Sequence, residues 1–184
     1  MARMKLVVVG NGMAGMRTLE ELIKIAPDLY DITVFGAESH PNYNRILLSH
    51  VLTGETRFED IMLNAIDWYA KHGITLHLNK RVVRIDRGSR TVFADDGTSA
   101  GYDRLLLATG STPVILPIPG SNLKGVMGFR NIRDVKIMIE KCAMSRYAVV
   151  IGGGLLGLEA ANGLLVRGMD VTVVHIMPWL MERQ

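Results

Sequence analysis

The sequence predicts an α/β protein with a Rossmann-like domain, built from a parallel sheet and a small antiparallel meander, followed by the start of a second Rossmann-like domain. Two observations support this prediction. Residues 5–35 and 147–174 repeat one order: a short β-branched run, a glycine-rich turn, a segment of helical period and a second β-branched run. Short alternating runs separated by turn residues lie between the repeats. Strand–helix–strand units form parallel sheets, so we expect two such sheets, each covered by helices on both faces.

Both repeats contain apolar residues at helical spacing. These residues are Leu19, Leu22, Ile23 and Ala26 in the first repeat and Leu158, Ala161, Leu164 and Leu165 in the second. Pro27 and Gly168 follow and supply the stop for each predicted helix. The second repeat provides only two predicted strands, so we expect its sheet to be only partly formed by this chain.

The middle of the chain predicts one helix and several short strands. The helix is expected over residues 58–71, and the strands over residues 74–78, 81–86, 90–94 and 102–108. Asp96 and Gly97 form a turn signal, which favours an antiparallel meander inserted into the first sheet.

A proline-rich stretch then predicts a linker. Its residues are Pro113, Pro117, Pro119 and Gly120. We therefore expect one domain over residues 1–116 and a second over residues 117–184.

Composition excludes several classes of protein. Of the 184 residues, 48% are hydrophobic, which excludes a disordered chain. Cys142 is the only cysteine, which rules out an internal disulfide and a redox dithiol, and the five histidines are too scattered to suggest a metal site. The 21 positive and 18 negative residues are interleaved, so nucleic-acid binding is not expected. The longest apolar-looking run, residues 147–166, contains five glycines and does not suit a membrane span, so we expect a cytoplasmic protein.

The first glycine-rich turn has the pattern G-x-G-x-x-G directly after a predicted strand and before a predicted helix. It reads Gly10-Asn11-Gly12-Met13-Ala14-Gly15. In such a turn the first glycine permits the tight bend, the second lets a pyrophosphate approach the backbone, and the third allows helix and strand to pack closely. The phosphate would then meet free N–H groups at the positive end of the helix.

The second turn, Gly152-Gly153-Gly154-Leu155-Leu156-Gly157, stands in the same strand-to-helix setting. Two such turns are far more specific than one, because glycines in a single turn can serve the bend alone. They predict two dinucleotides, one in each domain. A hydride donor and a bound flavin are the pairing that such an arrangement suggests.

An acidic residue that binds a ribose is expected at the end of the second strand of each repeat. Glu38 is the candidate in the first repeat, with a solvated surface acid as the alternative. In the second repeat His175 stands at this place, and histidine neither favours a free 2′-hydroxyl nor repels a 2′-phosphate strongly. The choice between NADH and NADPH therefore stays open.

Several segments resemble the FAD- and NAD(P)-dependent pyridine nucleotide oxidoreductases. Besides the first glycine turn, the resemblance is carried by Pro41-Asn42-Tyr43-Asn44-Arg45-Ile46-Leu47-Leu48-Ser49, Tyr102-Asp103-Arg104-Leu105-Leu106-Leu107-Ala108-Thr109-Gly110, Phe129-Arg130-Asn131-Ile132-Arg133-Asp134 and Pro178-Trp179-Leu180-Met181-Glu182-Arg183-Gln184. The chain most resembles the flavin-bearing N-terminal region of NAD(P)H-dependent nitrite reductase large subunits, a branch that belongs to nitrogen metabolism. The resemblance covers essentially the whole chain.

The resemblance implies an FAD site in the domain 1–116 and an NAD(P)H site in the domain 117–184. The implied FAD-binding residues are Gly10, Gly12, Met13, Ala14, Gly15, Glu38, Arg45, Val82, Ala108, Thr109, Gly110 and Arg130. The implied residues for the nicotinamide dinucleotide are Gly152, Gly154, Leu155, Leu156 and Gly157. Arg45 and Arg130 could instead be surface ion-pair residues, and Val82 is a strand residue in any case.

Two residues depart from the family pattern. His50 stands where related ferredoxin and rubredoxin reductases carry lysine, and Ala37 stands where many relatives have the acid that follows the glycine. The first departure argues against those branches, and the second weakens the assignment of the ribose to Glu38.

The resemblance implies an oxidoreductase that passes electrons from NAD(P)H through FAD to an acceptor, as in nitrite reductase. Hydride transfer needs no titrating protein group, so no catalytic acid or base is predicted. The alternatives are a ferredoxin reductase, a rubredoxin reductase, an NADH oxidase, or a truncated nucleotide-binding fragment without activity. We expect an N-terminal portion of a larger enzyme, with further domains or a separate acceptor protein as partner. A homodimer is left open, and full activity of the chain alone is not expected.

Overall fold

The computed structural model describes residues 3–182, which divide into two units. Unit 1 comprises Met1–Asn44 and Met62–Ser111, and unit 2 comprises Arg45–Ile61 and Thr112–Gln184. Arg183 and Gln184, two residues of the resemblance, lie outside the described residues. The division follows Ser111, and it assigns residues 45–61 to unit 2. A division by packing does not test which cofactor each part binds, so the domains 1–116 and 117–184 stay a prediction.

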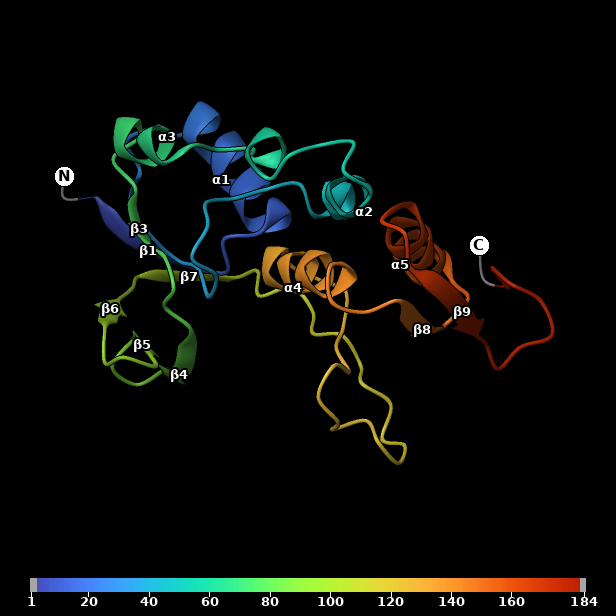
Figure 1. The fold of residues 1–184 in the computed structure, drawn as a ribbon. Helices are drawn as coiled ribbons and strands as arrows, with labels where there is room; N and C mark the ends of the chain where they lie inside the picture. The colour runs from blue at the N-terminus through green and yellow to red at the C-terminus, as the bar shows by residue number, and fades with distance from the viewer. Residues whose placement is uncertain (1–2, 183–184) are drawn as a thin grey trace. The chain divides into compact units, whose positions relative to one another are not determined.

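A four-stranded parallel sheet with the strand order β3-β2-β1-β7 forms the centre of unit 1. Its strands are β1 (Met4–Val9), β2 (Tyr30–Phe35), β3 (Thr75–His77) and β7 (Arg104–Leu107). Helix α1 (Met13–Ile25) connects β1 to β2 across one face, as the first repeat predicts (Figure 1). The sheet and helix confirm the expected Rossmann-like organisation.

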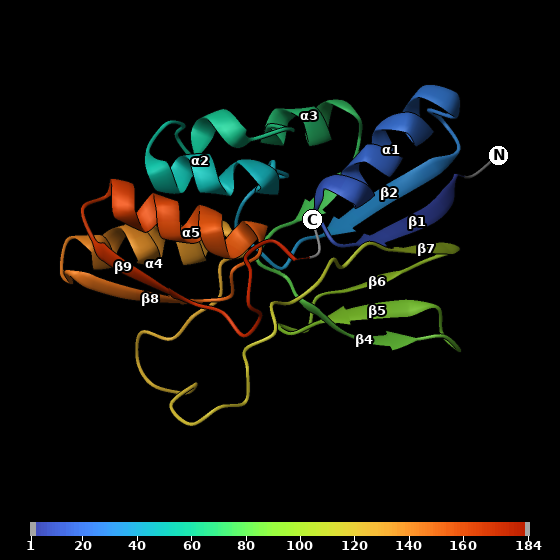
Figure 2. The same ribbon diagram turned by 90° about the vertical axis from the view of Figure 1, so that its right-hand side faces the viewer.

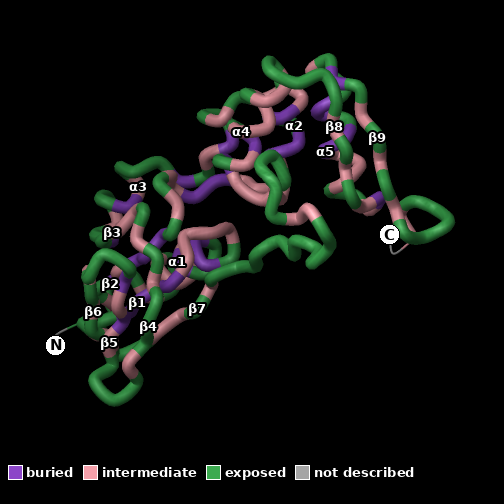
Figure 3. Tube along the Cα trace, turned by 60° about the horizontal axis from the view of Figure 1, so that its bottom comes forward, coloured by how far each residue is buried: buried purple, intermediate pink, exposed green. Residues whose placement is uncertain are grey.

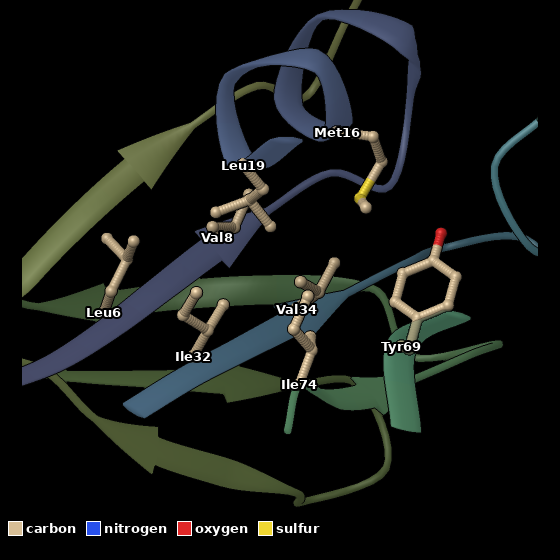
Figure 4. Close-up of a cluster of buried hydrophobic side chains, with 8 residues drawn as sticks. All are labelled: Leu6, Val8, Met16, Leu19, Ile32, Val34, Tyr69 and Ile74. Carbon is tan, nitrogen blue, oxygen red and sulfur yellow. The ribbon is translucent and has the colours of Figure 1, made fainter. Parts of the chain in front are cut away.

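Strand β1 is buried on both faces, because its alternate side chains enter two different cores. Leu6 and Val8 pack under α1 and α3 (Ile66–Lys71), together with Met16, Leu19, Ile32, Val34, Tyr69 and Ile74 (Figure 4). Val7 and Val9 face the other way and pack against Phe35, Val92 and Ala94. Over residues 6–9 no side chain has a solvent-facing position, which is why this part of β1 reads as a continuous apolar run, whereas Lys5 before it is exposed.

An antiparallel meander covers the second face of this sheet (Figure 2). Its strands are β4 (Val82–Asp86), β5 (Thr91–Ala94) and β6 (Ser99–Gly101), in the order β4-β5-β6. The meander is confirmed, but it forms a sheet of its own. The expectation of helices on both faces is therefore wrong for unit 1, because β5 supplies the apolar cover instead.

The single helix expected over residues 58–71 is also wrong. The segment contains a 3-10 turn, η2 (Glu59–Ile61), and the helix α3, separated by Met62–Ala65. Leu63 donates its N–H to the carbonyl oxygen of Asn42 at 2.9 Å, and the Asn64 side chain bonds to Asn42 at 2.8 Å and to Glu20 at 3.0 Å. These long-range hydrogen bonds hold the backbone of residues 62–65 in a bent, non-helical course, so a continuous helix cannot form here.

Unit 2 contains a two-stranded parallel sheet, β8 (Tyr147–Ile151) and β9 (Asp170–Val174), joined by helix α5 (Leu155–Val166). Its other helices among the described residues are η1 (Arg45–Leu47), α2 (Leu48–Thr53), η2 and α4 (Ile132–Cys142). Helix α4 begins with a capping box, in which the side chains of Asn131 and Asp134 each accept a backbone N–H of the other. The second strand–turn–helix–strand repeat is thus confirmed.

One face of the β8–β9 sheet lacks a cover among the described residues (Figure 3). Tyr147, Val149 and Ile151 alternate along β8 and are 72%, 64% and 56% exposed. Helices on both faces are therefore not found for the second sheet either. No helix within residues 3–182 is both long and apolar enough to cross a membrane.

Candidate nucleotide-binding sites

Two of the three motif glycines in the first turn are required by the protein's own packing. Gly10 has a φ of +115°, and a Cβ there would lie 2.1 Å from the carbonyl oxygen of Ala108. A Cβ on Gly15 would lie 2.9 Å from the Gly10 carbonyl oxygen and 3.0 Å from the Ala108 Cβ. The turn is therefore pressed against the end of β7, and any side chain at these two positions would push them apart.

Gly12 has no such reason to be glycine. It is the N-cap of α1, with φ −94° and ψ 177°, a conformation open to every residue. A Cβ at Gly12 would meet nothing within 4 Å, and no side chain caps the helix. The backbone at the positive end of α1 thus faces open space, which is what a pyrophosphate approaching the N–H groups requires. The first turn fits a dinucleotide.

The second turn repeats this division of roles in unit 2. Gly152 has a φ of +121°, and a Cβ on Gly157 would lie 2.0 Å from the Gly152 carbonyl oxygen. Gly154, the N-cap of α5, has φ −82° and ψ 179°, and a Cβ there would meet nothing within 4 Å. Leu155 and Leu156 follow it in the first turn of α5 and are 46% and 56% exposed. The second turn therefore fits a second dinucleotide.

A tyrosine that the sequence analysis missed holds the first turn. The Tyr69 hydroxyl donates to Asn11 Oδ1 at 2.9 Å and accepts the backbone N–H of Asn42 at 3.3 Å. Burial raises the pKa of Tyr69, so the hydroxyl keeps the proton that it donates. Tyr69 lies 58 residues from Asn11, and no local pattern connects the two.

The remaining predicted residues of unit 1 lie at strand ends or in the meander. Glu38 follows β2, and its carboxylate accepts a hydrogen bond from the Tyr43 hydroxyl at 2.8 Å. Ala108, Thr109 and Gly110 follow β7, where Ala108 touches the first turn as described. Val82 opens β4, pairs with Ala94 and packs on the second core. Glu38 is thus at the strand end where a ribose-binding acid is expected.

Arg45 and Arg130 belong to unit 2, where they lie together. The Arg45 guanidinium donates to the Arg130 carbonyl oxygen at 3.2 Å. Both line a pocket of about 30 Å³ with Leu156 of the second turn. The other lining residues are Ile46, Leu48, Ser49, Phe129 and Glu159. Glu159 was not predicted. It is the only charged residue of α5 and follows Leu156 by three residues, and this is the signal that could have indicated it.

A second unpredicted acid lies beside the second turn. His175, the first residue after β9, accepts the Gly153 N–H through Nδ1 at 3.1 Å. Its Nε2 lies 3.0 Å from a carboxylate oxygen of Glu182. Because Glu182 is seven residues farther along the chain, a search for an acid directly after the strand does not find it.

Fold and sites together define a two-unit α/β protein with one Rossmann-type dinucleotide turn in each unit. Comparison with known families agrees, since the model of the pyridine nucleotide-disulphide oxidoreductases matches residues 4–184. The chain belongs to that family.

Similar proteins include a nitrite reductase, an electron transfer subunit of a nitrate reductase and an NADH oxidase. The chain is 55% identical over 184 residues to a nitrite reductase [NAD(P)H] of Bacillus subtilis, covering 100% of this chain and 23% of that protein. It is 50% identical to the assimilatory nitrate reductase electron transfer subunit of the same organism, covering 100% and 24%. Among solved structures, a water-forming NADH oxidase from Lactobacillus brevis bound to NADH superposes with a TM-score of 0.87 at 27% identity, covering 97% of this chain and 41% of that one. The chain thus spans about a quarter of the length of the curated relatives.

Proposed function

We propose that the first glycine turn binds FAD, that the second binds NAD(P)H, and that the chain is the electron-entry region of an NAD(P)H-dependent nitrite reductase. The observation that carries this proposal is the pair of open positions at Gly12 and Gly154. Each is a glycine that neither the backbone conformation nor the packing requires, and each faces open space at the N-terminus of a helix after a parallel strand. The 55% identity over the whole chain supports the nitrite reductase assignment.

The chain's own residues would bind and orient the two cofactors. Gly12, Met13 and Ala14 at the start of α1 would offer N–H groups to the FAD pyrophosphate, with Gly10 and Gly15 keeping the turn tight against Ala108. Bound FAD supplies the ability to accept a hydride and to pass electrons on. Gly154, Leu155 and Leu156 at the start of α5 would hold the nicotinamide dinucleotide in the same way.

The charged residues would act on cofactor phosphates and hydroxyls and would not take part in proton transfer. Arg45, whose side chain donates to the Arg130 carbonyl oxygen, and Arg130 itself would present guanidinium groups to FAD. Glu38, oriented by Tyr43, would accept a hydrogen bond from a ribose hydroxyl. The acceptor of the electrons would be a further domain or a separate protein, because Cys142 is the only cysteine and cannot form a redox dithiol.

An oxygen-reducing relative is the second candidate, favoured by the structural likeness to the NADH oxidase. That likeness rests on 27% identity, against 55% and 50% for the nitrite and nitrate reductase proteins. Nitrite reductase is therefore the better-supported assignment.

Flavin stoichiometry in a Gly12→Leu variant tests the proposal. Wild-type chain, incubated with FAD and desalted, should retain close to one flavin, and Gly12→Leu should retain almost none because its side chain fills the space of the pyrophosphate. The two apoproteins should unfold at the same temperature, because a Cβ at Gly12 meets no protein atom within 4 Å. The matched control is Gly88→Leu, in the exposed turn between β4 and β5. A wild-type chain that stays colourless, or a Gly12→Leu chain that keeps its flavin, would contradict the assignment.

A further inference from the structure

The segment that follows β9 folds back on the second glycine turn. Met181 donates its N–H to the Gly153 carbonyl oxygen at 3.0 Å. A Cβ on Gly153 would lie 2.4 Å from Leu180 Cδ2 and 2.9 Å from His175 Cγ. The absence of a side chain at Gly153 therefore permits this packing, and the packing fixes where residues 175–182 lie relative to the turn.

The hydrogen bonds of His175 determine which ring nitrogen carries the proton in the neutral imidazole. Nδ1 accepts the N–H of Gly153 at 3.1 Å, so it has no hydrogen of its own in this arrangement. The proton is then on Nε2, which lies 3.0 Å from Oε2 of Glu182 and donates to it. His175 thus links the backbone of the glycine turn to a carboxylate.

This carboxylate is held in place and partly shielded from water. The side chains of His175 and Glu182 are only 13% and 21% exposed. A charge with such limited hydration is screened less by solvent and salt than one on a free surface side chain. Glu182 therefore places a defined negative charge beside the end of β9.

The end of the second strand is the place where Rossmann-type units recognise the adenosine ribose. An acid at this place accepts a hydrogen bond from a free 2′-hydroxyl and repels a 2′-phosphate. His175 occupies the position in the sequence, and the hydrogen bond from His175 brings Glu182 to it in space.

We propose that Glu182, oriented by His175, makes the second glycine turn select NADH over NADPH. The inference rests on the proposed function, because it presumes that this turn binds a nicotinamide dinucleotide. Glu182 is a specificity-determining residue and His175 a positioning residue; neither is assigned a role in hydride transfer.

Calorimetric titration of the chain with NADH and, separately, with NADPH tests this inference. Wild-type chain should bind NADH more tightly, and Glu182→Gln should bring the ratio of the two dissociation constants toward one by about tenfold, since glutamine keeps an acceptor for His175 and loses the charge. Glu182→Asp should keep most of the preference. Glu140→Gln, which removes an exposed acid from α4 of the same unit, should leave the ratio unchanged.

Salt provides a second measurement. Because the Glu182 side chain is 21% exposed, raising the ionic strength screens its repulsion in part, so the wild-type preference for NADH should shrink, and the preference of Glu182→Gln should respond less. A structural defect would weaken both ligands together and leave their ratio unaltered. Equal affinities of the wild-type chain for NADH and NADPH would overturn this inference and leave the proposed function intact. A ratio of dissociation constants that Glu182→Gln does not change would do the same. Failure of the wild-type chain to bind either dinucleotide would overturn the proposed function and the inference with it.

Discussion

The glycines of the two turns serve different neighbours. Gly10 and Gly15 make room for Ala108, Gly157 makes room for Gly152, and Gly153 makes room for Leu180 and His175. Gly12 and Gly154 make room for no protein atom within 4 Å. The glycines of one motif thus fall into two groups, those that shape the turn and those that leave space for a ligand. Substitution in the first group should lower stability, and substitution in the second should lower ligand binding.

Tyr69→Phe should loosen the first turn, because it leaves Asn11 Oδ1 without its donor. Loss of a buried hydrogen bond costs about 1–2 kcal/mol, so the free energy of unfolding and the affinity for FAD should both fall. Urea unfolding and flavin titration measure the two effects. Tyr147→Phe, at a 72% exposed tyrosine, is the matched control and should change neither. If the Tyr69→Phe chain were as stable as the wild type and bound FAD as tightly, the Tyr69–Asn11 hydrogen bond would not support the turn.

Residues 45–61 join unit 2 because of how helix α2 packs. A Cβ on Gly163 of α5 would lie 2.6 Å from Cγ of Leu52, which is fully buried. The Arg167 guanidinium, at the end of α5, donates to the carbonyl oxygens of Val51 and Leu52. Close helix packing at Gly163 and these two hydrogen bonds therefore fix α2 to α5, and they also hold the neighbouring Arg45 in the same unit as Leu156.

Gly163→Ala should destabilise unit 2, although alanine is the better helix former. The added methyl group meets Leu52, and overpacking of a buried contact costs about 1–3 kcal/mol, which exceeds the gain of about 1 kcal/mol in helix propensity. Thermal unfolding followed by circular dichroism would measure the change. Asn162→Ala, at the exposed neighbouring position, should be neutral or stabilising. A Gly163→Ala chain as stable as Asn162→Ala would disprove the close contact between α2 and α5.

Local patterns predicted the elements that depend on local chemistry. Both glycine turns, their flanking strands and helices, and the antiparallel meander follow from periodicity and turn residues, and the structure confirms them. The break between η2 and α3 depends on Asn42, twenty-two residues from Asn64 along the chain, so no local pattern indicates it. The same holds for Tyr69 beside Asn11 and for Glu182 beside His175, which only tertiary packing brings together.

The two units share one arrangement of a strand, a glycine turn and a helix N-terminus, and we propose that each binds a dinucleotide there. Family membership and the 55% identity place it among pyridine nucleotide oxidoreductases. Under the proposed function, the ligand of the second turn reduces the ligand of the first.

Anaerobic titration of the FAD-loaded chain with NADH, followed by the visible absorbance of the flavin, tests that step most directly. We predict that stoichiometric NADH bleaches the flavin, and that Gly154→Leu keeps the flavin but loses the bleaching because its side chain occupies the dinucleotide position in the second turn. Dithionite should bleach both proteins and so show that the flavin is reducible. A wild-type flavin that dithionite reduces and NADH does not would contradict the account.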